Sequence, residues 1–172
     1  MSQQSSLDTL DLIGDGETFR DKLVSMIEHA PMFGDFTRQE INSVAQYLRA
    51  YAAKKGSIIF REGEKGLFMV VVVDGRVDVL KQTPGHERKK VAVVRPGKSM
   101  GEMSLLDDLP YSATAQASED TTLLMLTKMN FEKLAQEQPV LCNLLLRQLA
   151  RLMSLRLRQT TGILLDYLGE TK

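Results

Sequence analysis

Residues 95–117 read RPGKSMGEMSLLDDLPYSATAQA, and this stretch gives the most information about fold and function. A Pro-Gly pair ends a strand-like segment at 96–97, and a short helical turn is predicted over 101–106. A loop follows, and then an alternating segment of small and polar residues over 112–115. A glycine before a helical turn can direct free backbone N–H groups at one point, as in many phosphate sites. The stretch therefore predicts an anion site built mainly from backbone.

Glu102 follows this glycine directly, in a place where a carboxylate is unfavourable for an anion. The residue fits if its side chain accepts a hydrogen bond from a hydroxyl group, and a ribose next to a phosphate supplies one. Taken alone, Glu102 would more often be a solvated carboxylate at a helix start, and Ser112 an ordinary strand residue.

The segments before this stretch have the pattern of helices followed by short strands. Helical spacing of apolar residues over 19–27 ends at Pro31, and a second helix is predicted from Thr37, with Glu40 in the capping-box position. An Asp-Gly pair at 74–75 between two β-branched segments predicts a hairpin. Short strands are predicted at 57–60, 67–73, 77–79, 91–94 and 121–126. The pattern indicates a mainly β sandwich, roll or small barrel.

After a short helix near 130–137, a long helix is predicted from Pro139 almost to the end of the chain. It carries two adjacent apolar stripes, one with Leu141, Leu145, Leu152 and Leu155, the other with Leu146, Leu149, Met153 and Leu157. We expect one stripe to pack on the β part and the other on a partner helix, which predicts a homodimer. The alternative is one broad core-facing stripe, with Gly162 ending or kinking the helix.

The charges balance over the whole chain, with 22 Lys+Arg against 22 Asp+Glu, but they do not balance along it. Residues 1–40 hold eight acids and three bases, whereas 49–98 hold twelve bases and five acids. Four arginines and no acid lie in 147–158. These are either ordinary solvated faces or a middle and end that receive an anion.

Several functional classes find little support in the composition. A neutral chain lacks the basic surface of a dedicated nucleic-acid binder, and one cysteine, Cys142, excludes an intrachain disulfide framework. The longest apolar run, 67–73, is far shorter than the roughly 20 residues of a membrane helix. We expect a soluble, cytoplasmic protein with no membrane association.

Catalysis and metal binding also find little support. The two histidines, His29 and His86, lie in different segments, and the sequence shows no metal-ligand spacing and no nucleophile–base arrangement. We therefore predict that the chain is not an enzyme and needs no cofactor or metal.

Residues 101–117 resemble the phosphate-binding cassette of the cyclic-nucleotide-binding domain, the sensor shared by catabolite activator-like regulators, kinase regulatory subunits and nucleotide-gated channels. That cassette reads approximately Gly-Glu-x-x-Leu-Leu, a loop, Pro-Arg, then Ser/Thr-Ala-Thr-x-x-Ala. The resemblance extends to 58–66, which is similar to the glycine-rich hairpin of the family, and covers about 140 residues from near Phe33. It implies an α+β, mainly β fold: a jelly-roll-like β-roll (double-stranded β-helix) with N-terminal helices and a long C-terminal helix.

The resemblance also implies a ligand site. Glu102 would accept from the ribose 2′-hydroxyl, and the backbone of Gly101 and of Ser112–Ala113, with the Ser112 hydroxyl, would hold the cyclic phosphate. Residues 155–159 of the long helix would approach the base, in a dimer partly from the other subunit. The joint placement of these residues in a long match favours the functional interpretation. The implied ligand-binding residues are Gly101, Glu102, Met103, Ser104, Tyr111, Ser112, Ala113 and Arg156.

One position departs from the family pattern. Where the family pattern has the arginine that pairs with the phosphate, this chain has Tyr111, and tyrosine supplies no charge. Losing such a pair reduces affinity by about ten- to a hundredfold or somewhat more. The site then binds a cyclic mononucleotide weakly, takes another ligand such as cyclic di-GMP or an uncharged or aromatic-stacking molecule, or binds nothing. Arg156 or Arg158 could supply a compensating cation, although solvated arginines are the commoner case.

We expect three parts: a flexible acidic tail over 1–17, helices and β-roll over 18–138, and a dimerisation helix over 139–172. Only four residues follow Leu168, so we expect a stand-alone sensor without a DNA-reading module and without direct DNA binding. The expected function is regulatory: a cyclic nucleotide binds and shifts the long helix, which acts on an unknown downstream protein. The alternative is a ligand-free dimerisation or protein-interaction module on the same fold.

Overall fold

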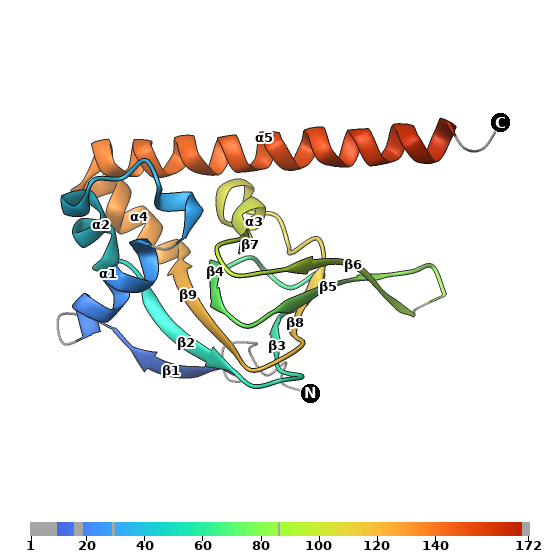
Figure 1. The fold of residues 1–172 in the computed structure, drawn as a ribbon, viewed down its shortest axis with the longest axis horizontal. Coiled ribbons are helices and arrows are strands. Elements are labelled where there is room, and N and C mark those ends of the chain that lie inside the picture. Colours follow the sequence, from blue (N-terminus) through green and yellow to red (C-terminus); the bar gives the residue numbers. More distant parts are fainter. Residues whose placement is uncertain (1–9, 16–18, 29, 86, 170–172) are drawn as a thin grey trace.

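Two antiparallel sheets form the centre of the molecule, and helices cover one end of it (Figure 1). The computed structural model describes residues 10–15, 19–28, 30–85 and 87–169. The first sheet has the order β1 (Asp11–Gly14), β2 (Arg49–Ala53), β9 (Thr121–Thr127), β4 (Phe68–Asp74), β7 (Ser99–Met100). The second has the order β3 (Ile58–Phe60), β8 (Thr114–Ala117), β5 (Val77–Gln82), β6 (Arg88–Val94). The predicted β-roll with helices at both ends of the chain is confirmed.

Strand β4 separates two hydrophobic cores. Phe68, Val70 and Val72 belong to the core between the sheets, whereas Met69 and Val71 belong to the core between the first sheet and the helices. Strand β9 alternates in the same way. Because both faces of these strands are buried, their sequences are unbroken apolar runs rather than alternating ones.

The turn at Asp74-Gly75 is not a hairpin, contrary to the sequence-based prediction. Strands β4 and β5 belong to different sheets, and β4 already pairs with β9 on one side and β7 on the other. The turn carries the chain from one sheet to the other. Gly75 has φ +86°, and a Cβ there would lie 2.5 Å from the carbonyl oxygen of Asp120, so the crossing requires glycine. The hairpin in this region joins β5 to β6.

The helices at the N-terminal end begin and end where local sequence signals predict. Helix α1 spans Arg20–Glu28, a 3₁₀ turn spans Pro31–Phe33, and α2 spans Arg38–Ala45. The Glu40 N–H donates to Thr37 Oγ1 at 3.3 Å, and the Thr37 N–H donates to Glu40 Oε2 at 2.7 Å. The predicted capping box is therefore confirmed.

Helix α5 spans Pro139–Gly169 and follows α4 (Lys128–Glu137). It continues through Gly162, so the alternative of a helix that ends there is wrong. Figure 1 shows α5 running past the other helices and over α3 (Glu102–Asp107). Its first half buries Leu141, Leu145 and Leu149 in the helical core, whereas all residues over 154–165 are exposed. In both predicted stripes the residues become more exposed toward the second half of α5. The position along the helix therefore decides burial more than the stripe does.

The N-terminal segment is more ordered than the sequence indicated. Residues 11–14 form β1, which pairs antiparallel with β2, and Leu10 is buried between the sheets. The expectation of a flexible tail is therefore wrong for residues 10–14; residues 1–9 and 16–17 lie outside the described part of the chain. This strand could not be predicted from the local sequence, because it is short and it pairs with β2 residues that are 36 or more positions away.

Within the described residues, no helix combines the length and apolar character needed to cross a bilayer. The described part of the chain also holds no cluster of three or more His, Cys, Asp or Glu side chains that could hold a metal ion. Both histidines, His29 and His86, lie outside the described residues.

Candidate functional site

Gly101 sets the position of the first candidate residue, Glu102. Strand β7 pairs with β4 and leads into Gly101, whose φ of +80° is left-handed. A Cβ at Gly101 would lie 3.0 Å from the Phe68 carbonyl oxygen and 3.2 Å from the Tyr111 ring. Only glycine combines this φ with so close an approach. The chain then turns directly into α3, with Glu102 as its first residue.

The Glu102 carboxylate is buried, with 2% of the residue exposed. Its Oε1 accepts a hydrogen bond from the Arg156 guanidinium on α5. Its Oε2 is also buried but has no hydrogen-bond partner among the described residues. A buried charged oxygen without a partner is unfavourable. The Oε2 atom is therefore well suited to accept a hydrogen bond from a bound hydroxyl group.

Arg156 connects the long helix to this carboxylate. Its Nη2 donates to the Ser99 carbonyl oxygen at 2.5 Å, so the guanidinium contacts both β7 and the start of α3. The sequence placed Arg156 near the site, and the structure brings it there, but as the partner of Glu102. In this arrangement the guanidinium is not free to bind a phosphate group. Arg158 is exposed on the same helix.

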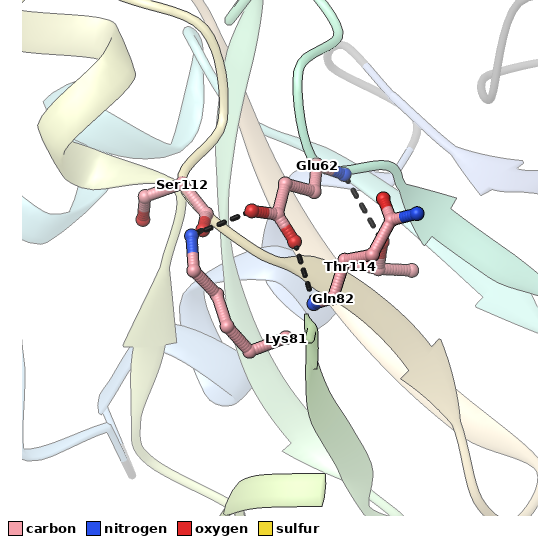
Figure 2. A network of polar contacts seen from close by, with 5 residues as sticks. All are labelled: Glu62, Lys81, Gln82, Ser112 and Thr114. Carbon is pink, nitrogen blue, oxygen red and sulfur yellow. Dashed lines mark hydrogen bonds and ion pairs between the residues drawn. The ribbon is translucent and has the colours of Figure 1, made fainter. Parts of the chain in front are cut away.

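Ser112 and Ala113 lie just before β8, with Ser112 exposed and Ala113 half-buried. The Ser112 carbonyl oxygen accepts from Lys81 Nζ at 2.5 Å, and the same Nζ lies 2.6 Å from Glu62 Oε1 (Figure 2). The Gln82 N–H donates to Glu62 Oε2 at 3.0 Å. The hydrogen bond from Lys81, and next that from Gln82, lower the pKa of the Glu62 carboxyl group below its usual value.

Sequence reasoning missed both Lys81 and Glu62. Lys81 is one of twelve bases in the 49–98 segment, and nothing in its neighbours distinguishes it. The two residues lie 19 positions apart, and they meet because β8 pairs with both β3 and β5 and brings the segment after β3 close to the end of β5. They could have been found only by searching for opposite charges in segments that are expected to lie beside the cassette.

Tyr111 is a core residue, so its expected place in the ligand pocket is not supported. Only 3% of it is exposed, and its ring stacks on Phe60 with centroids 4.0 Å apart. Its hydroxyl donates to the Phe68 carbonyl oxygen at 2.7 Å and accepts from the Phe68 N–H at 3.2 Å. Burial raises the pKa of Tyr111 to about 12. The ring fills space between the sheets beside Gly101, and the neutral phenol is hydrogen-bonded to the backbone of Phe68.

The last two expected residues differ in their surroundings. Met103 is half-exposed on α3, whereas Ser104 is buried. A Cβ on Gly66 would overlap the Ser104 side chain, so Ser104 packs against the glycine-rich segment before β4. The structure thus brings Gly101, Glu102 and Arg156 together, and gives Ser104 a packing role.

Replacing Tyr111 by phenylalanine should lower the free energy of unfolding by about 1–3 kcal/mol, because the buried Phe68 N–H and C=O lose their partner. Urea unfolding followed by circular dichroism measures this change. Tyr51→Phe is the matched control, since the half-buried Tyr51 hydroxyl makes no hydrogen bond within the described chain. We expect less than about 0.5 kcal/mol for the control. Equal losses in the two variants would contradict this assignment.

Known proteins share both the sequence and the fold. Residues 52–138 match the family described as cyclic nucleotide-binding domain. The chain is 32% identical over 130 residues to the cyclic AMP receptor protein of Thermus thermophilus, covering 76% of this chain and 58% of that one. It is also 32% identical over 114 residues to a cyclic nucleotide-gated potassium channel of Rhizobium etli, covering 66% and 30%. The chain spans less than two thirds of the length of these curated relatives.

Solved structures agree. A cyclic nucleotide-binding domain from Methylobacillus flagellatus superimposes with a TM-score of 0.82 at 27% identity, covering 96% of this chain and 93% of that one. The Thermus thermophilus catabolite activator protein gives a TM-score of 0.71 at 32% identity, covering 81% and 63%.

Proposed function

The chain belongs to the cyclic nucleotide-binding domain family, and we propose that it is a regulatory module that binds a cyclic nucleotide at residues 101–113 and transmits this binding through α5. The observation that carries the proposal is the unpartnered Oε2 of the buried Glu102, directly after left-handed Gly101. Relatives named for cyclic AMP and cyclic nucleotides make cyclic AMP the first ligand to test.

The proposed contacts follow from the chemistry of the site. Glu102 Oε2 accepts a hydrogen bond from the ribose 2′-hydroxyl, and such a charge-assisted bond is stronger than a neutral one. The cyclic phosphate contacts the backbone at Gly101 and at Ser112–Ala113, together with the Ser112 hydroxyl. The exposed segment of α5 after Arg156 faces the base. In this arrangement the ribose hydroxyl and the cyclic phosphate contact different groups of the cassette.

Arg156 supplies the proposed route to the helix. A ribose hydroxyl at Glu102 changes the hydrogen bonding of the carboxylate that holds Arg156, and so changes the attachment of α5 at that point. The first half of α5 is packed in the core, whereas 154–165 is exposed. That segment can therefore shift with little loss of buried apolar area. A ligand that favours one position of the segment shifts its population.

Calorimetry tests the proposal directly. Cyclic AMP, cyclic GMP and cyclic di-GMP are titrated separately into the protein, and we expect heat of binding for at least one of them at micromolar to millimolar concentration. The absence of heat for all three at millimolar concentration would contradict the proposal. The remaining function would then be the ligand-free interaction module.

We also propose that α5 pairs with the same helix of a second copy. Apolar side chains remain exposed along its second half, in which Leu157 and Leu164 are seven residues apart and share a face. Their exposed fractions are 69% and 54%, whereas Leu141, Leu145 and Leu149 in the first half of the same helix are at most 6% exposed. A heptad spacing of this kind is typical of a helix that packs against another. The exposed apolar residues there are Leu155, Leu157, Ile163, Leu164 and Leu165.

The double variant Leu157→Glu/Leu164→Glu should therefore convert a dimer into a monomer in sedimentation-velocity experiments at micromolar concentration. Two added acids on each helix repel across the seam and remove its apolar contact. Gln159→Glu, on the opposite side of the helix, is the control and should stay dimeric. A wild-type monomer, or a double variant that remains dimeric, would contradict this prediction.

A further inference from the structure

Lys81 lies beside the cassette in a polar network with Glu62, Gln82, Ser112 and Thr114 (Figure 2). Its Nζ donates to the Ser112 carbonyl oxygen and pairs with Glu62. Glu62 is itself fixed, because its backbone N–H donates to Thr114 Oγ1 at 3.0 Å and its Oε2 accepts from the Gln82 N–H. The network holds a cationic group at the end of the cassette, next to the backbone that is proposed to contact the phosphate.

A cyclic phosphate diester carries a negative charge, and the candidate residues Tyr111 and Arg156 supply no free cation for it. Tyr111 is neutral and faces the core, and the Arg156 guanidinium is bound to Glu102 and Ser99. Lys81 differs from both, since about half of its side chain is exposed. A lysine on a flexible stem can turn its three N–H donors from one acceptor to another without moving the backbone.

We propose that Lys81 is the phosphate-binding cation of this chain, held by Glu62 and Ser112 in the ligand-free state and transferred to the phosphate when the ligand binds. This inference rests on the proposed function of the cassette. It makes Lys81 a specificity-determining residue that favours a charged cyclic nucleotide over the uncharged nucleoside. It makes Glu62 a positioning residue, which competes with the ligand for the same ammonium group.

The test compares cyclic AMP with adenosine, which has the same base and ribose but no phosphate. Lys81→Met should weaken cyclic AMP binding by about ten- to a hundredfold and change adenosine binding by less than about twofold. Lys81→Arg keeps the charge and should retain affinity within about threefold. The matched control is Lys90→Met, because Lys90 forms a similar exposed pair with Asp78 at 3.1 Å in the same sheet. It should leave both affinities unchanged.

A second variant changes affinity in the opposite direction. Glu62→Gln removes the competing carboxylate and should strengthen cyclic AMP binding severalfold, and this gain should disappear in a Lys81→Met background. Unfolding curves of each variant establish that the fold is retained.

The possible outcomes distinguish the role of Lys81 from the proposed function of the cassette. Unchanged cyclic AMP affinity in Lys81→Met, or failure of Lys81→Arg to retain it, overturns the role of Lys81 and leaves the proposed function intact. Equal losses of affinity for cyclic AMP and adenosine in Lys81→Met would indicate a structural role for Lys81. That result would overturn its role as the phosphate-binding cation as well. A wild-type protein that binds none of cyclic AMP, cyclic GMP and cyclic di-GMP overturns the proposed function, and the role of Lys81 with it.

Discussion

Arg156→Met should lower the free energy of unfolding by about 3 kcal/mol, the largest loss that we expect from a single change on α5. The variant leaves the Glu102 carboxylate buried at 2% exposure without its cation. Removing one partner of a buried ion pair costs roughly 3–5 kcal/mol, because the remaining charge stays desolvated. We expect the lower end of this range, since 44% of the Arg156 side chain is exposed and water reaches part of the site.

The double variant Arg156→Met/Glu102→Gln tests this cause. It removes both charges, so it should be more stable than Arg156→Met alone, although it carries one more substitution. Arg151→Met is the matched control on the same helix, because Arg151 pairs with the exposed Asp35 and should cost less than about 1 kcal/mol. Urea unfolding measures all three variants. Similar losses for Arg156→Met and Arg151→Met would contradict a buried pair.

Glu102→Gln should weaken cyclic AMP binding by about ten- to a hundredfold. The substitution keeps the size of the side chain but replaces the charge-assisted acceptor of the ribose hydroxyl by a neutral amide. 2′-Deoxy-cyclic AMP lacks that hydroxyl, so the variant and the wild-type protein should bind it with nearly equal affinity. Calorimetry with both ligands isolates the single contact between Glu102 and the hydroxyl.

The exposed Glu132 on α4 provides a control for this experiment. Glu132→Gln makes the same chemical change away from the cassette and should leave both affinities unchanged. If Glu102→Gln weakened cyclic AMP and its 2′-deoxy analogue equally, Glu102 would act on the structure of the site rather than on the ribose.

Local signals predicted much of the fold. The capping box at Thr37 and Glu40 specifies a helix start through bonds between residues three apart, and the apolar spacing after Pro139 specifies a long helix. These features depend on interactions between residues that are close in the sequence, so they can be predicted from it. The Asp74-Gly75 turn shows the limit: it fixes the glycine backbone, but it does not determine which strands pair.

The candidate site was predictable only where a motif fixes the backbone. Gly101 and Glu102 lie at the start of a short helix, as the sequence predicted, because a left-handed glycine leads into that helix. The direction of Tyr111 could not be predicted, since it depends on Phe60 and Phe68, more than 40 residues away. The partners of Glu102 and Ser112 likewise come from residues 54 and 31 positions distant.

Amide hydrogen exchange tests the coupling between the cassette and α5 most directly. Exchange is measured with and without saturating cyclic AMP, in the wild-type protein and in Glu102→Gln at equal ligand concentration. We predict slower exchange over 101–113 and altered exchange over 152–165 in the wild-type protein, with both changes lost or strongly reduced in the variant. Protection of the cassette without any change in α5 would contradict the account.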